Sequence, residues 1–388
     1  MKGRLAAAAL LAAFSGTHAP AEELEPYEMV RSLQRVQDRI ADGDHAALPM
    51  QAKLLGIIDG RLRAATLEAF EDPRNRDAVL IYGASGGNPE TLDMIVSRLN
   101  FEGAEETFAR GVVRYAHGDA ASARQLLREI EPLDLDGVLA APLALMAGSL
   151  VTQEDPAAAL DLFDRARLLS PGTLIEEAAL RRSVAISASL KATERFLRAA
   201  EQYVRRFVRS PYASRYAEDF VSGVVALQAE IDLNVLEAIV AEMDREKAHA
   251  IYLRIARQSA IDSHRELLAF AAGKAREYAP AEETEDDPRA LLYANAARVA
   301  SPDVDDVLAV LGRIDESRLS SGDRRLLKAA REIAADVIAP PALAKRAEAA
   351  PAEAEDETDA APATAEYVAA TRDKLRAIDV LLGEEARP

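Results

Sequence analysis

Residues 159–171 read Ala-Leu-Asp-Leu-Phe-Asp-Arg-Ala-Arg-Leu-Leu-Ser-Pro, and the prediction of the fold starts from them. Ala159, Phe163 and Ala166 recur at steps of four and three, which places them on one face of a helix. Two small residues let a neighbouring helix approach closely, and the large one fills the groove between the helices. Pro171 follows, as expected where the chain turns. The pattern predicts the second helix of a helical hairpin.

Weaker copies of this pattern lie on both sides. Their residues are Gly111, Tyr115, Ala123 and Leu127 before the stretch, and Ala199, Tyr203 and Pro211 after it. The anchoring alanines are 36 and 40 residues apart, close to the period of about 34 residues of tetratricopeptide (TPR) repeats. We therefore predict an all-α fold, a TPR-like α-solenoid of stacked helical hairpins with an N-terminal helical cap and a flexible linker to a C-terminal helix. Such arrays usually bind partners.

The composition supports a helical chain with an acidic surface. Of the 388 residues, 49% are hydrophobic but only 5% are aromatic, so the core must consist mostly of aliphatic side chains. This favours helices over strands. The formal net charge is −18, which argues against nucleic acid or anionic lipid as a general partner because both attract basic surfaces.

The N-terminus has the pattern of a secretory signal. Lys2 and Arg4 precede an apolar run over residues 5–14, and Ala19-Pro20-Ala21 follows. This order predicts a signal peptide over residues 1–21, cleaved near Ala21. The run is too short to cross a bilayer, and no later segment is long and apolar enough, so we predict no membrane span in the mature chain. The simplest expectation is export into a bacterial periplasm, without disulfides because the chain has no cysteine.

The mature chain is predicted to divide into five segments. Residues 339–364 are rich in Ala, Pro and acids and cannot bury enough apolar surface to order themselves. The C-terminal helix that follows either docks onto the helical domain or binds a partner, and the sequence leaves both open. The segments are 22–100, an N-terminal helical hairpin and capping region; 101–275, the TPR-like repeats; 276–338, the C-terminal helices of the solenoid; 339–364, a disordered linker; and 365–388, an amphipathic helix.

A glycine-rich stretch requires a choice between two interpretations. Residues 83–87 read Gly-Ala-Ser-Gly-Gly after an apolar run, which matches the G-x-S-x-G elbow of a serine hydrolase with Ser85 as nucleophile. That elbow needs a parallel sheet behind it, and the sequence offers no second convincing strand. We favour a loop in which Asn88 caps the next helix and Pro89 takes its first position.

Basic residues gather between positions 195 and 215. They are Arg195, Arg198, Arg205, Arg206, Arg209 and Arg215. Such a cluster can meet an acidic partner, but a solvated helix face balanced by nearby glutamates is the favoured interpretation.

One segment resembles a known family. Residues 24–34, Leu-Glu-Pro-Tyr-Glu-Met-Val-Arg-Ser-Leu-Gln, continuing through residues 36–40 and 43–51, are similar to the opening of the rhizobial-type motility protein family MotC. Its members are periplasmic accessories of the flagellar motor. The resemblance implies a non-enzymatic partner of the periplasmic part of MotB, the stator subunit that anchors the motor to the cell wall. It carries over no site residues.

We therefore expect a non-enzymatic periplasmic motility protein that binds MotB and stabilises or positions it for flagellar rotation. The alternatives are a scaffold for another cell-envelope client and the serine hydrolase using Ser85. We expect no catalytic, cofactor-binding or metal-binding residues, since no titratable cluster has the required spacing.

Overall fold

The structure is a computed structural model that describes residues 24–135, 137–279 and 287–338. All of them belong to the first of two compact units, which ends at Ile338. The predicted signal peptide, linker and C-terminal helix lie outside the described residues. The proposed segment boundaries stay predictions.

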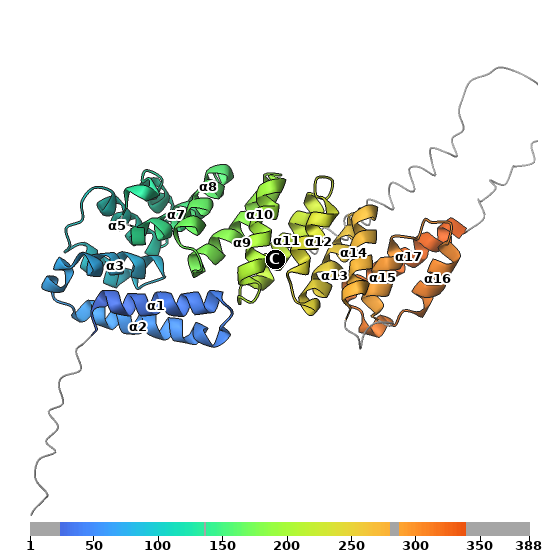
Figure 1. Ribbon diagram of the computed structural model, residues 1–388, viewed down its shortest axis with the longest axis horizontal. Helices are drawn as coiled ribbons and strands as arrows, with labels where there is room; N and C mark the ends of the chain where they lie inside the picture. The colour runs from blue at the N-terminus through green and yellow to red at the C-terminus, as the bar shows by residue number, and fades with distance from the viewer. Residues whose placement is uncertain (1–23, 136, 280–286, 339–388) are drawn as a thin grey trace, which may run out of the picture. The chain divides into compact units, whose positions relative to one another are not determined.

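All regular structure in the described part of the chain is helical, which confirms the all-α, helical-hairpin fold (Figure 1). The first half comprises α1 (Pro26–Ala41), α2 (Leu48–Ala64), α3 (Pro73–Ala84), α4 (Pro89–Val96), α5 (Gly103–Ala116), α6 (Ala120–Leu127), α7 (Gly137–Val151) and α8 (Pro156–Leu169). The second half comprises α9 (Leu174–Ser189), α10 (Thr193–Phe207), α11 (Ala213–Ala226), α12 (Leu233–Ala241), α13 (Arg245–Ile261), α14 (Arg265–Tyr278), α15 (Pro288–Ala296), α16 (Val304–Arg313) and α17 (Ser321–Ile338). Short 3-10 turns η1 (His45–Ala47), η2 (Leu67–Glu71), η3 (Pro132–Asp134) and η4 (Glu316–Arg318) connect some of them.

The stretch 159–171 forms the second helix of a hairpin, as predicted. Asp155 caps α8 by accepting a hydrogen bond from the amide of Ala158, and Pro156 takes the first helical position. Phe163 is fully buried. Its ring lies against Gly148 of α7, where an added Cβ atom would come within 2.8 Å of the ring. The small residue on α7 thus permits the close packing of the two helices, whereas the TPR-like detail of the repeat stays a prediction.

Two large clusters of buried side chains make up most of the core. The cluster formed by α9 and later helices contains a run of stacked rings. The ring centroids of Tyr203 and Tyr216 lie 4.0 Å apart, and those of Tyr216 and Phe220 lie 5.6 Å apart. Each hairpin packs on the next along the chain. The aromatic residues are few but concentrated here, which gives α10 and α11 a rigid junction.

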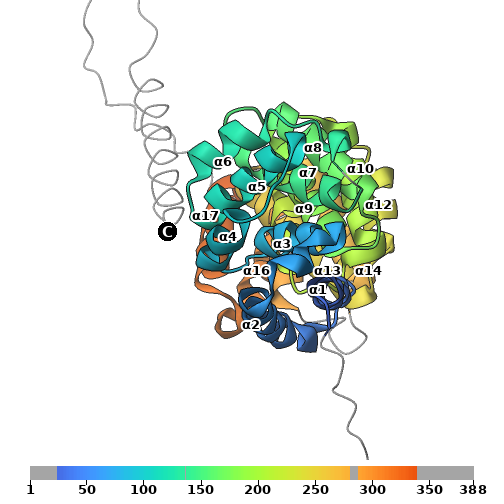
Figure 2. The same cartoon turned by 90° about the vertical axis from the view of Figure 1, so that its left-hand side faces the viewer.

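The N-terminal hairpin packs on more than its sequence neighbours. Helix α1 contacts both α2 and α3 and also reaches α9, far along the chain (Figures 1 and 2). Its buried stripe is Val30, Leu33, Val36 and Ile40. The helix ends at Ala41, directly before Asp42, Gly43 and Asp44.

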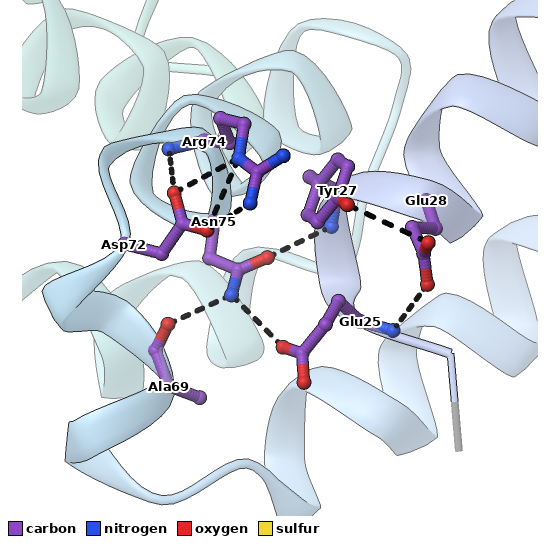
Figure 3. A network of polar contacts seen from close by, with 7 residues as sticks. All are labelled: Glu25, Tyr27, Glu28, Ala69, Asp72, Arg74 and Asn75. Atoms are coloured by element: carbon purple, nitrogen blue, oxygen red, sulfur yellow. Dashed lines mark hydrogen bonds and ion pairs between the residues drawn. The ribbon is translucent and has the colours of Figure 1, made fainter. Parts of the chain in front are cut away.

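A buried amide fixes the start of α1 (Figure 3). The side chain of Asn75 accepts a hydrogen bond from the amide of Tyr27 at 3.0 Å. It donates to the carboxylate of Glu25 at 3.0 Å and to the carbonyl of Ala69 at 2.7 Å. Glu25 also forms a capping box with Glu28. Hydrogen bonds of Asn75 therefore connect α3 to the segment that carries the family resemblance. This role of Asn75 is structural.

Candidate functional site

A cleft of about 570 Å³ lies between α1 and α9. Arg31, Arg35 and Asp38 line it from α1, and Glu177, Arg181 and Arg182 line it from α9. Apolar side chains from α3 and α7, including Ile81 and Met146, complete the lining together with Tyr115 of α5 and Tyr212. Because the cleft combines apolar surface with converging charges from distant parts of the chain, it is the best candidate site in the described residues.

The charge of the cleft is opposite to that of the chain. Its lining contains the four arginines and only two acids, Asp38 and Glu177, whereas the whole chain has a net charge of −18. Arg31 and Arg35 are exposed and lie one helical turn apart, so they face the same side of α1. The cleft is thus a local positive site on an acidic protein.

Glu177 is fully buried, and its carboxylate interacts with side chains of the same chain. Its Oε1 atom accepts hydrogen bonds from the hydroxyl of Tyr203 at 2.8 Å and from Nε of Arg181 at 3.0 Å. Burial raises the pKa of Tyr203 well above its usual range, and the Glu177 charge raises it further. The hydroxyl therefore stays protonated and donates. This network fixes Arg181, whose guanidinium also lies over the ring of Tyr212 at 5.3 Å from the centroid.

Arg182 has a different environment. It donates a hydrogen bond to the carbonyl of Ala178 at 3.1 Å and forms no ion pair in the described part of the chain. Burial lowers the pKa of Arg182, and the neighbouring Arg181 lowers it further. Even so, a guanidinium stays protonated at any physiological pH. Arg182 therefore presents a largely desolvated positive charge to the cleft.

The wall formed by α1 is fixed at its C-terminal end. Asp38 accepts a hydrogen bond at 3.2 Å from the amide of Leu174, the first residue of α9. Burial raises the pKa of Asp38 above its ordinary value, although the Leu174 amide counteracts part of this rise. Gly43 has φ +106° and lies so close to Arg209 that a Cβ atom would come within 2.9 Å of its carbonyl oxygen. The two walls are therefore already in place without a ligand.

A second concavity of about 630 Å³ lies between α11 and α13. Its charged lining residues are Glu218, Arg254, Arg257 and Asp262. Arg257 forms an ion pair with Asp323 at 3.0 Å. Since acids and arginines are balanced there, this surface selects less strongly for a charged partner than the cleft does.

The glycine-rich loop is structural, as favoured from the sequence. The apolar run before it belongs to helix α3, and Ser85 follows that helix as its C-cap. Asn88 caps α4 by accepting from the amide of Glu90, and Pro89 takes the first position. Gly87 lies against the ring of Tyr82, where an added Cβ atom would come within 2.4 Å. The strand and turn of a hydrolase elbow are therefore not formed here, although Ser85 does line the cleft.

The predicted basic cluster is largely paired with acids. Arg195 pairs with Asp161 and Asp164, at 2.7 and 2.6 Å. Arg206 pairs with Glu176 at 2.8 Å, and Arg205 and Arg215 have carboxylate partners too. This agrees with the favoured interpretation of a balanced helix surface.

Sequence reasoning missed the arginines that converge on the cleft. Arg31 and Arg182 are about 150 residues apart and belong to two different helices, so no local pattern distinguishes them. Only the packing of α1 on α9 brings them together.

The fold and the cleft define a class, namely proteins built of stacked helical hairpins with a cleft between them. In the described residues no helix has the length and apolarity needed to cross a membrane. Within the same residues, no group of three or more His, Cys, Asp or Glu side chains is placed to hold a metal ion.

Comparison with known proteins identifies the family. The family model described as "Chemotaxis protein MotC" matches residues 1–387. The chain is also 40% identical over 321 residues to the chemotaxis protein MotC of Rhizobium meliloti (strain 1021). The aligned region covers 82% of this chain and 74% of that protein. No solved structure shows a significant match. The chain belongs to the MotC family, as its opening segment indicated, and is a motility-related protein.

Proposed function

We propose that this protein is a non-enzymatic periplasmic motility protein that binds the periplasmic part of the stator protein MotB and stabilises or positions it for flagellar rotation. The observation that carries the proposal is membership of the MotC family over nearly the whole chain. The cleft between α1 and α9 supports it, because its walls are ordered and only the partner segment would bear an ordering cost. The N-terminal pattern of positive charge, apolar run and Ala-Pro-Ala supports export.

Calorimetric titration tests the partner. Residues 22–388 are titrated into the purified periplasmic part of MotB, and the titration is repeated with a chain that ends at Ile338. Saturable binding by both chains is the expected result and assigns the interface to the helical unit. Binding by the longer chain alone assigns it to residues 339–388. Absence of binding by both contradicts MotB as partner and favours another cell-envelope client.

Cell fractionation tests the location. The protein is expected in the periplasmic fraction, with an N-terminus near Glu22 by mass spectrometry. Full-length protein confined to the cytoplasm would contradict export.

A further inference from the structure

The cleft between α1 and α9 contains positive charges that the described residues do not neutralise. Arg31 and Arg35 form no ion pair in this part of the chain, although many surface arginines elsewhere do. Arg182 is bonded only to a main-chain carbonyl. This cleft of a strongly acidic protein therefore offers three guanidinium groups to a ligand.

Within the described residues, neither acid of the cleft forms an ion pair with these three arginines. The Glu177 carboxylate is bonded to Tyr203 and Arg181. The Asp38 carboxylate is bonded to the amide of Leu174 at the start of α9. A buried cation without a carboxylate partner costs free energy, and a carboxylate brought in by a ligand would offset that cost. The ligand must therefore supply negative charge.

The shape and the apolar lining indicate more than a free anion. Leu145 and Ile175 are partly buried and lie in the same cleft as the arginines, and the exposed ring of Tyr115 borders it. A simple inorganic anion would leave this apolar surface in contact with water. A peptide that carries both carboxylates and a large apolar side chain would cover the apolar surface and pair with the arginines.

We infer that the cleft between α1 and α9 binds an acidic peptide segment of a partner protein, with Arg31, Arg35 and Arg182 pairing its carboxylates and an apolar side chain packing near Leu145 and Ile175. The inference rests on the proposed function in one respect, namely that the segment is expected to belong to MotB. The chemistry of the cleft stands without that identity.

The first experiment measures binding of the full mature chain, residues 22–388, to the periplasmic part of MotB by calorimetry. The test variant is R31E/R35E, and the matched control is R98E/R128E, which changes the charge by the same amount at exposed arginines outside the cleft. All four positions are solvent-exposed, so both variants should fold. Reversing two rim charges should weaken binding about tenfold or more. The control should leave binding within about twofold.

The second experiment uses a probe that does not depend on MotB. A peptide Glu-Leu-Glu-Glu-Leu-Glu carrying a neutral dye is titrated with the same chains, and fluorescence anisotropy is measured. The wild type and R98E/R128E should bind it, with affinity falling as salt is raised. R31E/R35E should not bind it, and the counterpart Lys-Leu-Lys-Lys-Leu-Lys should not bind the wild type.

The two experiments separate the two proposals. If MotB binds the wild type and both double variants equally, the inference about the cleft is wrong while the proposed partner stands. If MotB fails to bind but the acidic peptide binds and depends on Arg31 and Arg35, the partner is wrong and the cleft chemistry stands. Equal binding of the acidic and basic peptides would also overturn the inference.

Discussion

The hydrogen bond from Tyr203 to Glu177 gives the sharpest test of how the cleft is supported. In Tyr203→Phe the ring remains, so its stacking on Tyr216 at 4.0 Å is retained and only the hydroxyl is lost. The lost bond is 2.8 Å long, is buried and ends on a carboxylate. Hydrogen bonds to charged groups contribute about 1.5–3 kcal/mol. Because Arg181 still pairs with Glu177 in the variant, we expect a loss of about 2 kcal/mol in the free energy of unfolding.

Urea unfolding followed by far-UV circular dichroism at neutral pH measures this loss. The slope of the free energy against urea should match the wild type, so that a lower midpoint reports lower stability. Tyr27→Phe is the matched control, since its hydroxyl lies 3.5 Å from Glu28 in a partly exposed position. It should lose less than about 0.5 kcal/mol. If both variants lose the same small amount of free energy of unfolding, the buried hydrogen bond from Tyr203 to the Glu177 carboxylate does not contribute as argued. The proposed role of that bond in holding Arg181 would then be wrong as well.

Three further predictions concern other parts of the fold. Gly148→Val should destabilise the protein by about 1–3 kcal/mol, because the valine side chain would overlap the ring of Phe163. Chemical denaturation measures this loss. Unchanged stability would contradict the close packing of α7 and α8. Asn75→Ala should cost about 3 kcal/mol in the same assay, since it removes three hydrogen bonds at about 1 kcal/mol each, whereas the exposed Asn100→Ala should be neutral. Burial alone would raise the pKa of Asp164, but hydrogen bonds from neighbouring arginines outweigh burial and lower the pKa. The stabilisation is therefore present above the unfolded value of 3.8 and is lost as pH falls below it. The stability difference between wild type and Asp164→Asn should be largest near neutral pH and shrink in acid, and a difference independent of pH would contradict this.

Local patterns were sufficient for the elements of this fold. The spacing of Ala159, Phe163 and Ala166 predicted α8 and its buried face, and Asn88 with Pro89 predicted the start of α4. Both predictions are correct because capping and amphipathic spacing act between residues that are close in sequence. The same local reasoning separated the glycine-rich loop from a hydrolase elbow, since no sheet was predicted to support Ser85.

The sequence by itself therefore determined the all-α class, the second helix of a hairpin at residues 159–171 and, through residues 24–51, the family. Tertiary structure alone decided the candidate site. Arg35 and Arg182 belong to helices far apart in the chain, and they line one cleft only because α1 packs against α9 as well as α2. That contact depends on Gly43 beside Arg209 and on Asp38 at the start of α9, each a pair of residues more than 100 positions apart. Hydrophobic periodicity specifies which face of a helix is buried, but not which distant helix buries it.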